Sequence, residues 1–218
     1  RRFRPDGRVA GGGVGARELA GACNEIGLVA DPAWWPKVNR HLQLLERWAP
    51  KMNLTTVSDP REALSRHVVD SLALLLLARV RDSRGPVLDV GSGAGFPGIP
   101  LAIARPDLDV SLLEPRQKRG VFLSRACAEA PTPNAHWLEG RLPDPKLNGR
   151  FDLVVSRATL SPTELLEAGR AALAPGGAIV IMAADPPWQD CPVGFLTLEV
   201  VAFELGGAQR WISALRPV

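Results

Sequence analysis

The sequence lacks the cysteine pattern that a disulfide framework or a zinc site requires. Among 218 residues there are 3 cysteines. Cys23, Cys127 and Cys191 stand apart, with no Cys-x-x-Cys pair and no neighbouring histidine. This pattern excludes both kinds of site and is typical of a protein kept in a reducing compartment. We therefore expect no metal site and a cytoplasmic location.

Long apolar runs are also missing. The longest, Leu72 to Ala78, is too short to cross a bilayer, and no signal peptide is recognisable. We expect no membrane partner and a monomeric protein. With 46% hydrophobic residues, the chain can form one α/β domain with a small appendage.

Charge of one sign is not in large excess. The net charge is +3 and the isoelectric point is about 9.1. Such a mild basic balance is compatible with a nucleic-acid partner and equally with a solvated basic face. Residues 1–15 hold several arginines and a run of glycines. We expect a disordered basic arm there, either a frayed terminus or a segment that touches RNA.

Apolar periodicity predicts an N-terminal helical cap over residues 16–80. Its helices are expected at Ala16–Leu28, at Pro36–Trp48 and from Ser58-Asp59-Pro60 to about Arg79. In the third helix, Asp59 can cap the first turn and Pro60 suits the first helical position.

From Pro86 onward, strands and helices alternate, and residues 86–218 are expected to form one domain. Strands are predicted at Val87–Val90, Val110–Glu114, Ala135–Leu138, Phe151–Ser156 and Ala178–Ala183, and helices at Ile99–Ala104, Arg116–Glu129 and Thr163–Ala174. Alternation of this kind indicates a parallel sheet with right-handed crossovers. Two further strands, Leu196–Glu204 and Ala208–Leu215, are joined by Gly206-Gly207 as a hairpin. The fold class is therefore α/β, with a doubly wound, seven-stranded, mostly parallel sheet whose last strand is antiparallel.

The stretch Val87–Leu101 has the pattern of a strand, a tight turn and a helix. Asp89 ends the strand, and glycines follow at Gly91, Gly93 and Gly95. Glycine allows a positive φ and a close approach of the backbone to a ligand, and the first N–H groups of the helix lack intrahelical partners. We expect a ligand loop there, with bare backbone donors beside an acid.

Two kinds of ligand compete for this loop. Gly93–Gly98 is a G-x-G-x-x-G, the dinucleotide pattern. Asp89–Gly95, an acid two residues before G-x-G-x-G, looks like motif I of class I methyltransferases, which bind S-adenosylmethionine. An acid suits the ammonium of that cofactor and would repel a pyrophosphate, so the methyltransferase interpretation is favoured. A glycine-rich turn without a ligand is the third interpretation.

Charged residues follow the second and fourth predicted strands. Glu114 ends the second strand, where a carboxylate meets ribose hydroxyls in nucleoside-binding sheets. Lys118 and Arg119 start the next helix, where cations oppose the helix dipole, so a phosphate contact is expected for them and for Arg210. Arg157 lies at the carboxyl edge of the sheet, where ligands bind.

His67, Asp70 and Ser71 have the side-chain chemistry of a hydrolytic triad but not its spacing. All three fall within one helix and cannot surround a shared substrate. We expect Arg66 and Asp70 to form an i,i+4 pair within a polar seam that fastens the third helix to the sheet.

Several motifs occur in a fixed order along the chain: Asn53–Thr55, Arg66–Ser71, Asp89–Leu101, Lys118–Leu123 and Phe151–Ala158. Together they make the chain resemble the bacterial small-subunit ribosomal RNA guanine-N7 methyltransferases, the glucose-inhibited division protein B family. The likeness is strong from Trp48 to Arg157 and weaker to Arg210.

The resemblance implies S-adenosylmethionine contacts and an RNA target, a guanine of 16S ribosomal RNA, free or in the small subunit. With the motif I residues, the expected cofactor contacts are Asp89, Gly91, Gly93, Gly95, Phe96, Glu114, Arg141, Leu142 and Arg157. Guanine N7 is already nucleophilic, so no acid–base residue is expected. Catalysis would consist of positioning by Arg157 and Arg210.

The chain departs from the family just past the fifth predicted strand. The family places a lysine and a glycine where this sequence has Ala183 and Ala184, followed by Asp185-Pro186-Pro187. We expect normal cofactor binding with slow or altered RNA methylation, unless Arg157 and Arg210 supply enough charge. A nicotinamide oxidoreductase, a non-catalytic RNA-binding protein, and a methyltransferase of another RNA, a protein or a small molecule remain as alternatives.

Overall fold

The computed structural model describes residues 14–57, 59–157, 159–186 and 190–218. Residues 1–13 of the expected basic arm therefore lie outside the described residues, as does Pro187. The rest of that arm belongs to the folded part, because Val14 is buried and Gly15 directly precedes the first helix.

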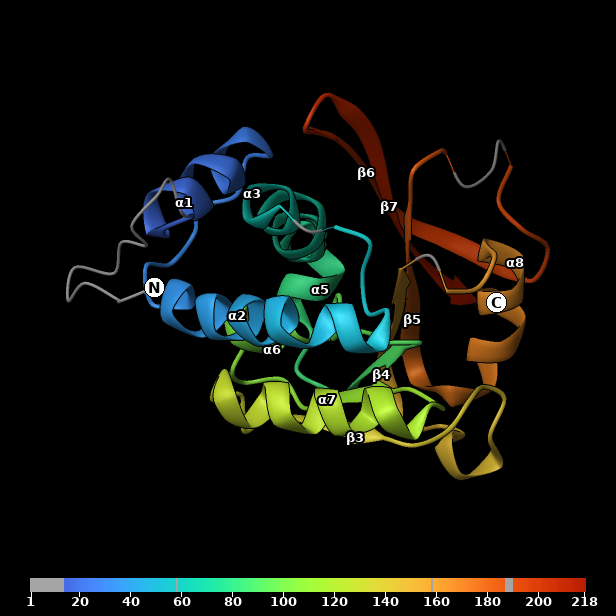
Figure 1. Cartoon of the computed structure of the whole chain (residues 1–218). Helices are drawn as coiled ribbons and strands as arrows, with labels where there is room; N and C mark the ends of the chain where they lie inside the picture. Colours follow the sequence, from blue (N-terminus) through green and yellow to red (C-terminus); the bar gives the residue numbers. More distant parts are fainter. Residues whose placement is uncertain (1–13, 58, 158, 187–189) are drawn as a thin grey trace.

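A seven-stranded sheet forms the centre of the molecule, in the order β3-β2-β1-β4-β5-β7-β6 (Figure 1). Strands β1 to β5 are parallel, and β7 runs antiparallel between β5 and β6. The predicted sheet and its antiparallel last strand are confirmed. The strands are β1 (Val87–Val90), β2 (Val110–Leu113), β3 (Ala135–Leu138), β4 (Phe151–Arg157), β5 (Leu173–Ala183), β6 (Phe195–Leu205) and β7 (Ala208–Pro217).

Helices cover both faces of this sheet. One face carries α1 (Ala16–Glu25), α2 (Trp34–Met52), the segment Pro60–Asp82, α6 (Gly98–Ala104) and α7 (Gln117–Glu129). The other face carries α8 (Pro162–Gly169) and the short 3-10 turns η3 (Pro145–Leu147) and η4 (Arg170–Ala172). In Figure 1, α2 lies along α7. The helices of the expected cap and the sheet bury their apolar side chains in one continuous core.

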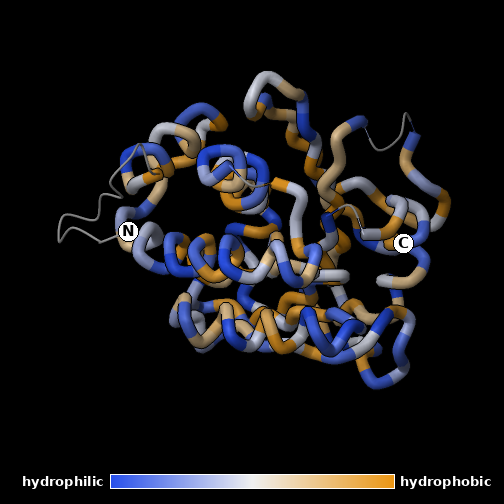
Figure 2. The backbone as a smooth tube through the Cα atoms, viewed as in Figure 1, coloured by the Kyte–Doolittle hydropathy of each residue, from blue (hydrophilic) through white to orange (hydrophobic). Residues whose placement is uncertain are grey.

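Apolar segments concentrate in the central strands, and polar and apolar residues alternate along the surrounding helices (Figure 2). Burial of one helix face against a sheet produces this alternation. None of the helices in the described ranges has the length and apolarity needed to cross a bilayer.

Several helix boundaries differ from the sequence expectation. Helix α1 ends at Glu25 rather than Leu28, because Gly27 has a φ of 76°. Helix α2 extends to Met52 and ends at Asn53, which is left-handed. The helix expected at Thr163–Ala174 gives way after Gly169 to η4, and β5 already begins at Leu173.

The third helix is not continuous, which corrects the expectation of one helix to Arg79. It consists of α3 (Pro60–Ala63), a π-helical segment η1 (Leu64–Val69), α4 (Asp70–Leu72), a 3-10 turn η2 (Ala73–Leu76) and α5 (Ala78–Asp82). Asp59 caps α3 as predicted, accepting hydrogen bonds from two backbone N–H groups. Leu77 is extended and breaks the helix. π-Helical turns often mark functional sites.

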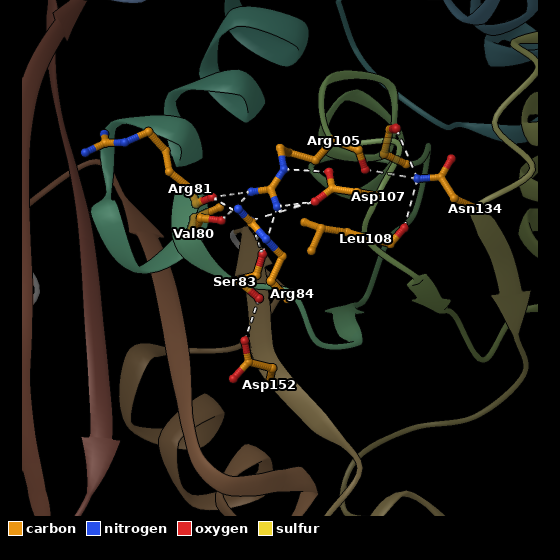
Figure 3. Close-up of polar contacts among 10 residues, drawn as sticks. Val80, Arg81, Ser83, Arg84, Arg105, Asp107, Leu108, Asn134 and Asp152 are labelled. Carbon is orange, nitrogen blue, oxygen red and sulfur yellow. Dashed lines mark hydrogen bonds and ion pairs between the residues drawn. The ribbon is translucent and has the colours of Figure 1, made fainter.

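A polar cluster fastens the helical segment to the amino ends of the strands (Figure 3). Arg105 donates hydrogen bonds to the carbonyl oxygens of Val80 at 2.8 Å and Ser83 at 2.7 Å, and it pairs with Asp107 at 2.6 Å. Ser83 in turn donates to Asp152 of β4. These contacts fix the start of β1 and leave the opposite, carboxyl edge of the sheet free for a site.

Candidate functional site

The loop after β1 has the backbone that its glycines predict. Gly91, Gly93 and Gly95 have φ values of 72°, 55° and 88°, a region that favours glycine. A Cβ on Gly91 would overlap the side chain of Thr159, and one on Gly95 would overlap Ile99. A Cβ on Gly93 would meet no atom nearer than 3.7 Å. A Cβ at Gly93 would therefore fit without overlap, at ordinary contact distance from the Gly91 carbonyl oxygen and Arg119.

Asp89 lies beneath the loop rather than at its surface. Its side chain is fully buried, and Oδ2 accepts a hydrogen bond from the backbone N–H of Gly98 at 2.9 Å. Oδ1 is buried and has no hydrogen-bond partner among the described residues. Burial raises the pKa of Asp89 to about 7, against the opposing effects of the Ser92 side chain, the Gly98 N–H and Arg157. Asp89 thus supports the loop and keeps one acceptor unused.

Glu114 directly follows β2 and reaches the same loop. The residue is 3% exposed. Oε2 accepts from the N–H of Gly93 at 3.2 Å, and Oε1 accepts from the N–H of Arg116 at 3.0 Å. Nη1 of Arg119 lies 3.8 Å from Oε2. The predicted ribose acid therefore lies against the glycine loop, held by an arginine.

The cations expected to contact RNA do not form one group. Lys118 is exposed, whereas Arg119 is turned toward Glu114. Arg210 lies on β7, where Nε is 3.8 Å from Oδ1 of Asp70. Arg119 thus pairs with Glu114, which leaves it less free than Lys118 to reach an RNA phosphate.

Phe96 forms the centre of an aromatic stack. Its ring centroid lies 4.8 Å from that of His41 and 5.0 Å from that of His67, and the Arg157 guanidinium lies 5.4 Å from it. Phe96 is consequently only 5% exposed. The ring predicted to contact the cofactor is therefore largely covered by protein.

Sequence reasoning missed the role of His41. Its Nε2 makes a hydrogen bond of 2.8 Å to the carbonyl oxygen of Ala94, which ties α2 to the glycine loop. Desolvation lowers the pKa of both His41 and His67 to about 4, so both rings are neutral near pH 7. The available signal was the position of His41 on the buried side of α2. It lies three residues after Val38 and four before Leu45.

Arg157 ends β4 and joins the helical segment to the sheet. Nη1 donates to the carbonyl oxygen of Arg66 at 2.9 Å and to Oδ2 of Asp70 at 3.2 Å. Nη2 lies 3.4 Å from Nδ1 of His67. The polar seam predicted from Arg66–Ser71 is confirmed by these contacts.

The expected ion pair between Arg66 and Asp70 is wrong. Arg66 pairs with Glu62 at 2.6 Å, and Asp70 faces Arg157 and Arg210. Both residues lie at the π-helical segment, whose wider turn changes the directions of successive side chains relative to an α-helix. Burial raises the pKa of Asp70, while Arg157 opposes the increase.

A cavity of about 340 Å³ opens beside Arg157, within the size range of small-molecule sites. It lies between the π-helical segment and the carboxyl ends of β4 and β5. Ala183 and Ala184, at the positions of the missing lysine and glycine, line it. Its lining consists of Thr56, Val57, Arg66, His67, Asp70, Arg157, Met182, Ala183, Ala184, Phe203, Arg210, Trp211 and Ile212.

Arg141 and Leu142 follow β3 at the same edge of the sheet. Arg141 is exposed, and Leu142 packs against the apolar core beneath α8. Over the described part of the chain, no group of three or more histidine, cysteine or acidic side chains could hold a metal ion.

Comparisons with known proteins identify the family and agree with the fold. A family model described as GidB, rRNA small subunit methyltransferase G, matches residues 35–191. Ribosomal RNA small subunit methyltransferase G of Nitrosomonas europaea is 44% identical over 120 residues, covering 55% of this chain and 54% of that protein. The protein of that name from Stenotrophomonas maltophilia is 35% identical over 180 residues, covering 81% of this chain and 83% of that protein.

The solved structures agree on the fold. A SAM dependent methyltransferase from Aquifex aeolicus matches with a TM-score of 0.58 and 18% identity, covering 75% of this chain and 96% of that chain. At this identity the likeness concerns the fold alone, which is that of the class I methyltransferases.

Proposed function

The chain belongs to the rRNA small subunit methyltransferase G family, and from this premise we propose that it methylates N7 of a guanine in 16S ribosomal RNA. It is a methyltransferase that uses S-adenosylmethionine. The structural observation that supports the proposal best is that one residue joins the cofactor loop to the cavity. Arg157 lies over Phe96 of the glycine loop and also lines the cavity.

The glycine loop fits S-adenosylmethionine on three observations. A Cβ at Gly93 would overlap no atom of the described residues, Asp89 keeps a buried oxygen without a hydrogen-bond partner among those residues, and Glu114 lies against the loop. When bound, the cofactor supplies a methyl group activated by a sulfonium. We assign the cofactor contacts to Asp89, Gly91, Gly93, Gly95, Phe96, Glu114, Arg141, Leu142 and Arg157, with Glu114 accepting hydrogen bonds from the ribose.

The side chains of this protein mainly have to position the RNA. Guanine N7 has a free lone pair and loses no proton on methylation, so no general base is required. His41 and His67 agree with this, because pKa values lowered to about 4 make both imidazoles weak bases. Arg157 and Arg210 would hold the RNA so that N7 faces the loop, a proximity effect.

The proposal is tested by incubating the protein with radiolabelled S-adenosylmethionine and small ribosomal subunits. We expect label in 16S ribosomal RNA at one guanine, mapped to N7 by cleavage of the RNA chain at 7-methylguanosine. Label at another atom or another base would refute the N7 assignment. Label in protein alone would refute an RNA target.

Lys118 and Arg119 are adjacent, but substitutions at these two positions should weaken the binding of different ligands. Because Lys118 is exposed, Lys118→Gln should weaken RNA binding and reduce the slope of log affinity against log salt by about 0.7–0.9. Because Arg119 lies beside Glu114, Arg119→Gln should instead weaken binding of S-adenosylmethionine. Filter binding over a salt series and calorimetry measure the two effects. An unchanged salt slope in Lys118→Gln would exclude it as a phosphate contact.

The missing lysine at the cavity gives a gain-of-function prediction. Ala183 lines the cavity, so Ala183→Lys should add a cation near the RNA and raise methylation of small subunits about tenfold, or about 1.4 kcal/mol. Cofactor affinity should stay unchanged. Ala183→Met, a long side chain without charge, is the matched control.

If Ala183→Lys leaves the rate unchanged and the wild-type rate is already high, the missing lysine is neutral. Arg157 and Arg210 then supply the charge unaided.

A further inference from the structure

The cavity beside Arg157 contains an acid that the proposed chemistry does not use. Asp70 lines the cavity, and its side chain is only 11% exposed. Arg157 bonds to Oδ2 at 3.2 Å. Oδ1 accepts no hydrogen bond among the described residues, and its nearest ion-pair partner, Nε of Arg210, is 3.8 Å away. One oxygen of the carboxylate is thus fixed while the other remains available to a donor.

The composition of the cavity favours a base over a phosphate. Met182, Phe203 and Ile212 supply apolar lining surface, which a base contacts favourably and a phosphate does not. The carboxylate of Asp70 would repel a phosphate. Of the three arginines in the lining, Arg157 and Arg210 face Asp70 and Arg66 pairs with Glu62, so their charge is not fully available to an anion.

Guanine has the edge that such a carboxylate recognises. Its Watson–Crick edge presents two donors, N1–H and the C2 amino group, whereas adenine presents an acceptor at N1 and no amino group at C2. N7 lies on the Hoogsteen edge, together with O6, which the two edges share. A contact to N1–H and the amino group therefore leaves N7 free, whereas an arginine bound to O6 and N7 would block it.

We propose that this cavity receives the target base and that the carboxylate of Asp70 selects guanine by accepting hydrogen bonds from its N1–H and C2 amino group. Arg157 and Arg210 act as positioning residues for this carboxylate. The base is taken out of its stack, as in other enzymes that act on nucleobases. The inference rests on the proposed function, because it assumes methylation of guanine N7.

The test compares guanosine with inosine, which lacks the C2 amino group. Small ribosomal subunits are reconstituted with 16S ribosomal RNA that carries either nucleoside at the position mapped above. For the wild-type protein, kcat/KM should be about 10- to 100-fold higher with guanosine. In Asp70→Asn, which keeps the side-chain shape, the ratio should fall at least fivefold. In Asp70→Ala it should approach one.

Glu62→Gln is the matched control, because Glu62 also pairs with an arginine of this segment but does not line the cavity. Its ratio should equal that of the wild type. If Asp70→Asn slows both substrates equally, Asp70 has a structural role only, and the inference is overturned. A wild-type protein that methylates N7 without discriminating the two nucleosides overturns the inference but not the proposed function. Methylation at an atom other than N7 overturns both.

Discussion

Gly93→Val should reduce the affinity for S-adenosylmethionine at least 100-fold while the protein keeps its fold. An added Cβ at Gly93 meets no protein atom nearer than 3.7 Å, so the larger side chain would occupy the space over the loop rather than the core. It would also constrain the backbone N–H of Gly93, which donates a hydrogen bond to Glu114. Calorimetric titration gives the affinity, and circular dichroism gives the fold.

Gly149→Val is the matched control for backbone strain. Gly149 has a φ of 69°, close to that of Gly93, and an added Cβ there has no atom of the described residues within 4 Å. Both variants should lose stability through the same left-handed strain, about 1–3 kcal/mol. Gly149→Val should bind the cofactor normally. Normal binding by Gly93→Val would place the cofactor site elsewhere.

Arg157→Met should cause the largest loss of stability among the site variants, about 3 kcal/mol. The arginine bonds to Asp70 and to the carbonyl oxygen of Arg66, and it covers Phe96. Its removal leaves the nearly buried carboxylate of Asp70 with Arg210 alone, at 3.8 Å. Chemical denaturation measures the loss, and methylation of small subunits should fall with it.

The stability deficit of Arg157→Met, relative to the wild type, should depend on pH. Burial raises the pKa of Asp70 in the folded protein, and loss of Arg157 should raise it further. Below the ordinary pKa of aspartate the carboxyl is protonated in both states, so its contribution to the deficit vanishes. The deficit grows as the pH rises from the folded-state pKa of Asp70 in the wild type to its higher folded-state pKa in the variant. Asp70→Asn should restore stability in the double variant. A deficit that is constant with pH would contradict this account.

Local sequence patterns predicted the sheet because each strand carries its own signal. The β-branched run Val87–Val90 and the glycines after it define β1 and the loop without reference to the rest of the chain. The capping role of Asp59 is also local. Helix boundaries were less predictable, since α2 continues four residues beyond Trp48, to Met52.

The contacts that build the site are long-range, and residue spacing could not predict them. Asp70 meets Arg157, 87 positions away, and His41 meets Ala94, 53 positions away. Sequence spacing suggested Arg66 as the partner of Asp70, because i,i+4 is the rule for an α-helix. The π-helical turn does not follow that rule. The residue types of Leu64–Val69 do not predict such a turn.

The order of strands in the sheet constrains the synthesis of the protein. β7 lies between β5 and β6, yet it follows both in the chain. Until Ala208–Pro217 has left the ribosome, β6 has no strand to pair with, and the inner edge of β5 stays open. Unpaired strand edges are templates for aggregation. A chain that ends between Leu205 and Pro217 would therefore have β1 to β5 paired, with β6 unpaired and one edge of β5 open.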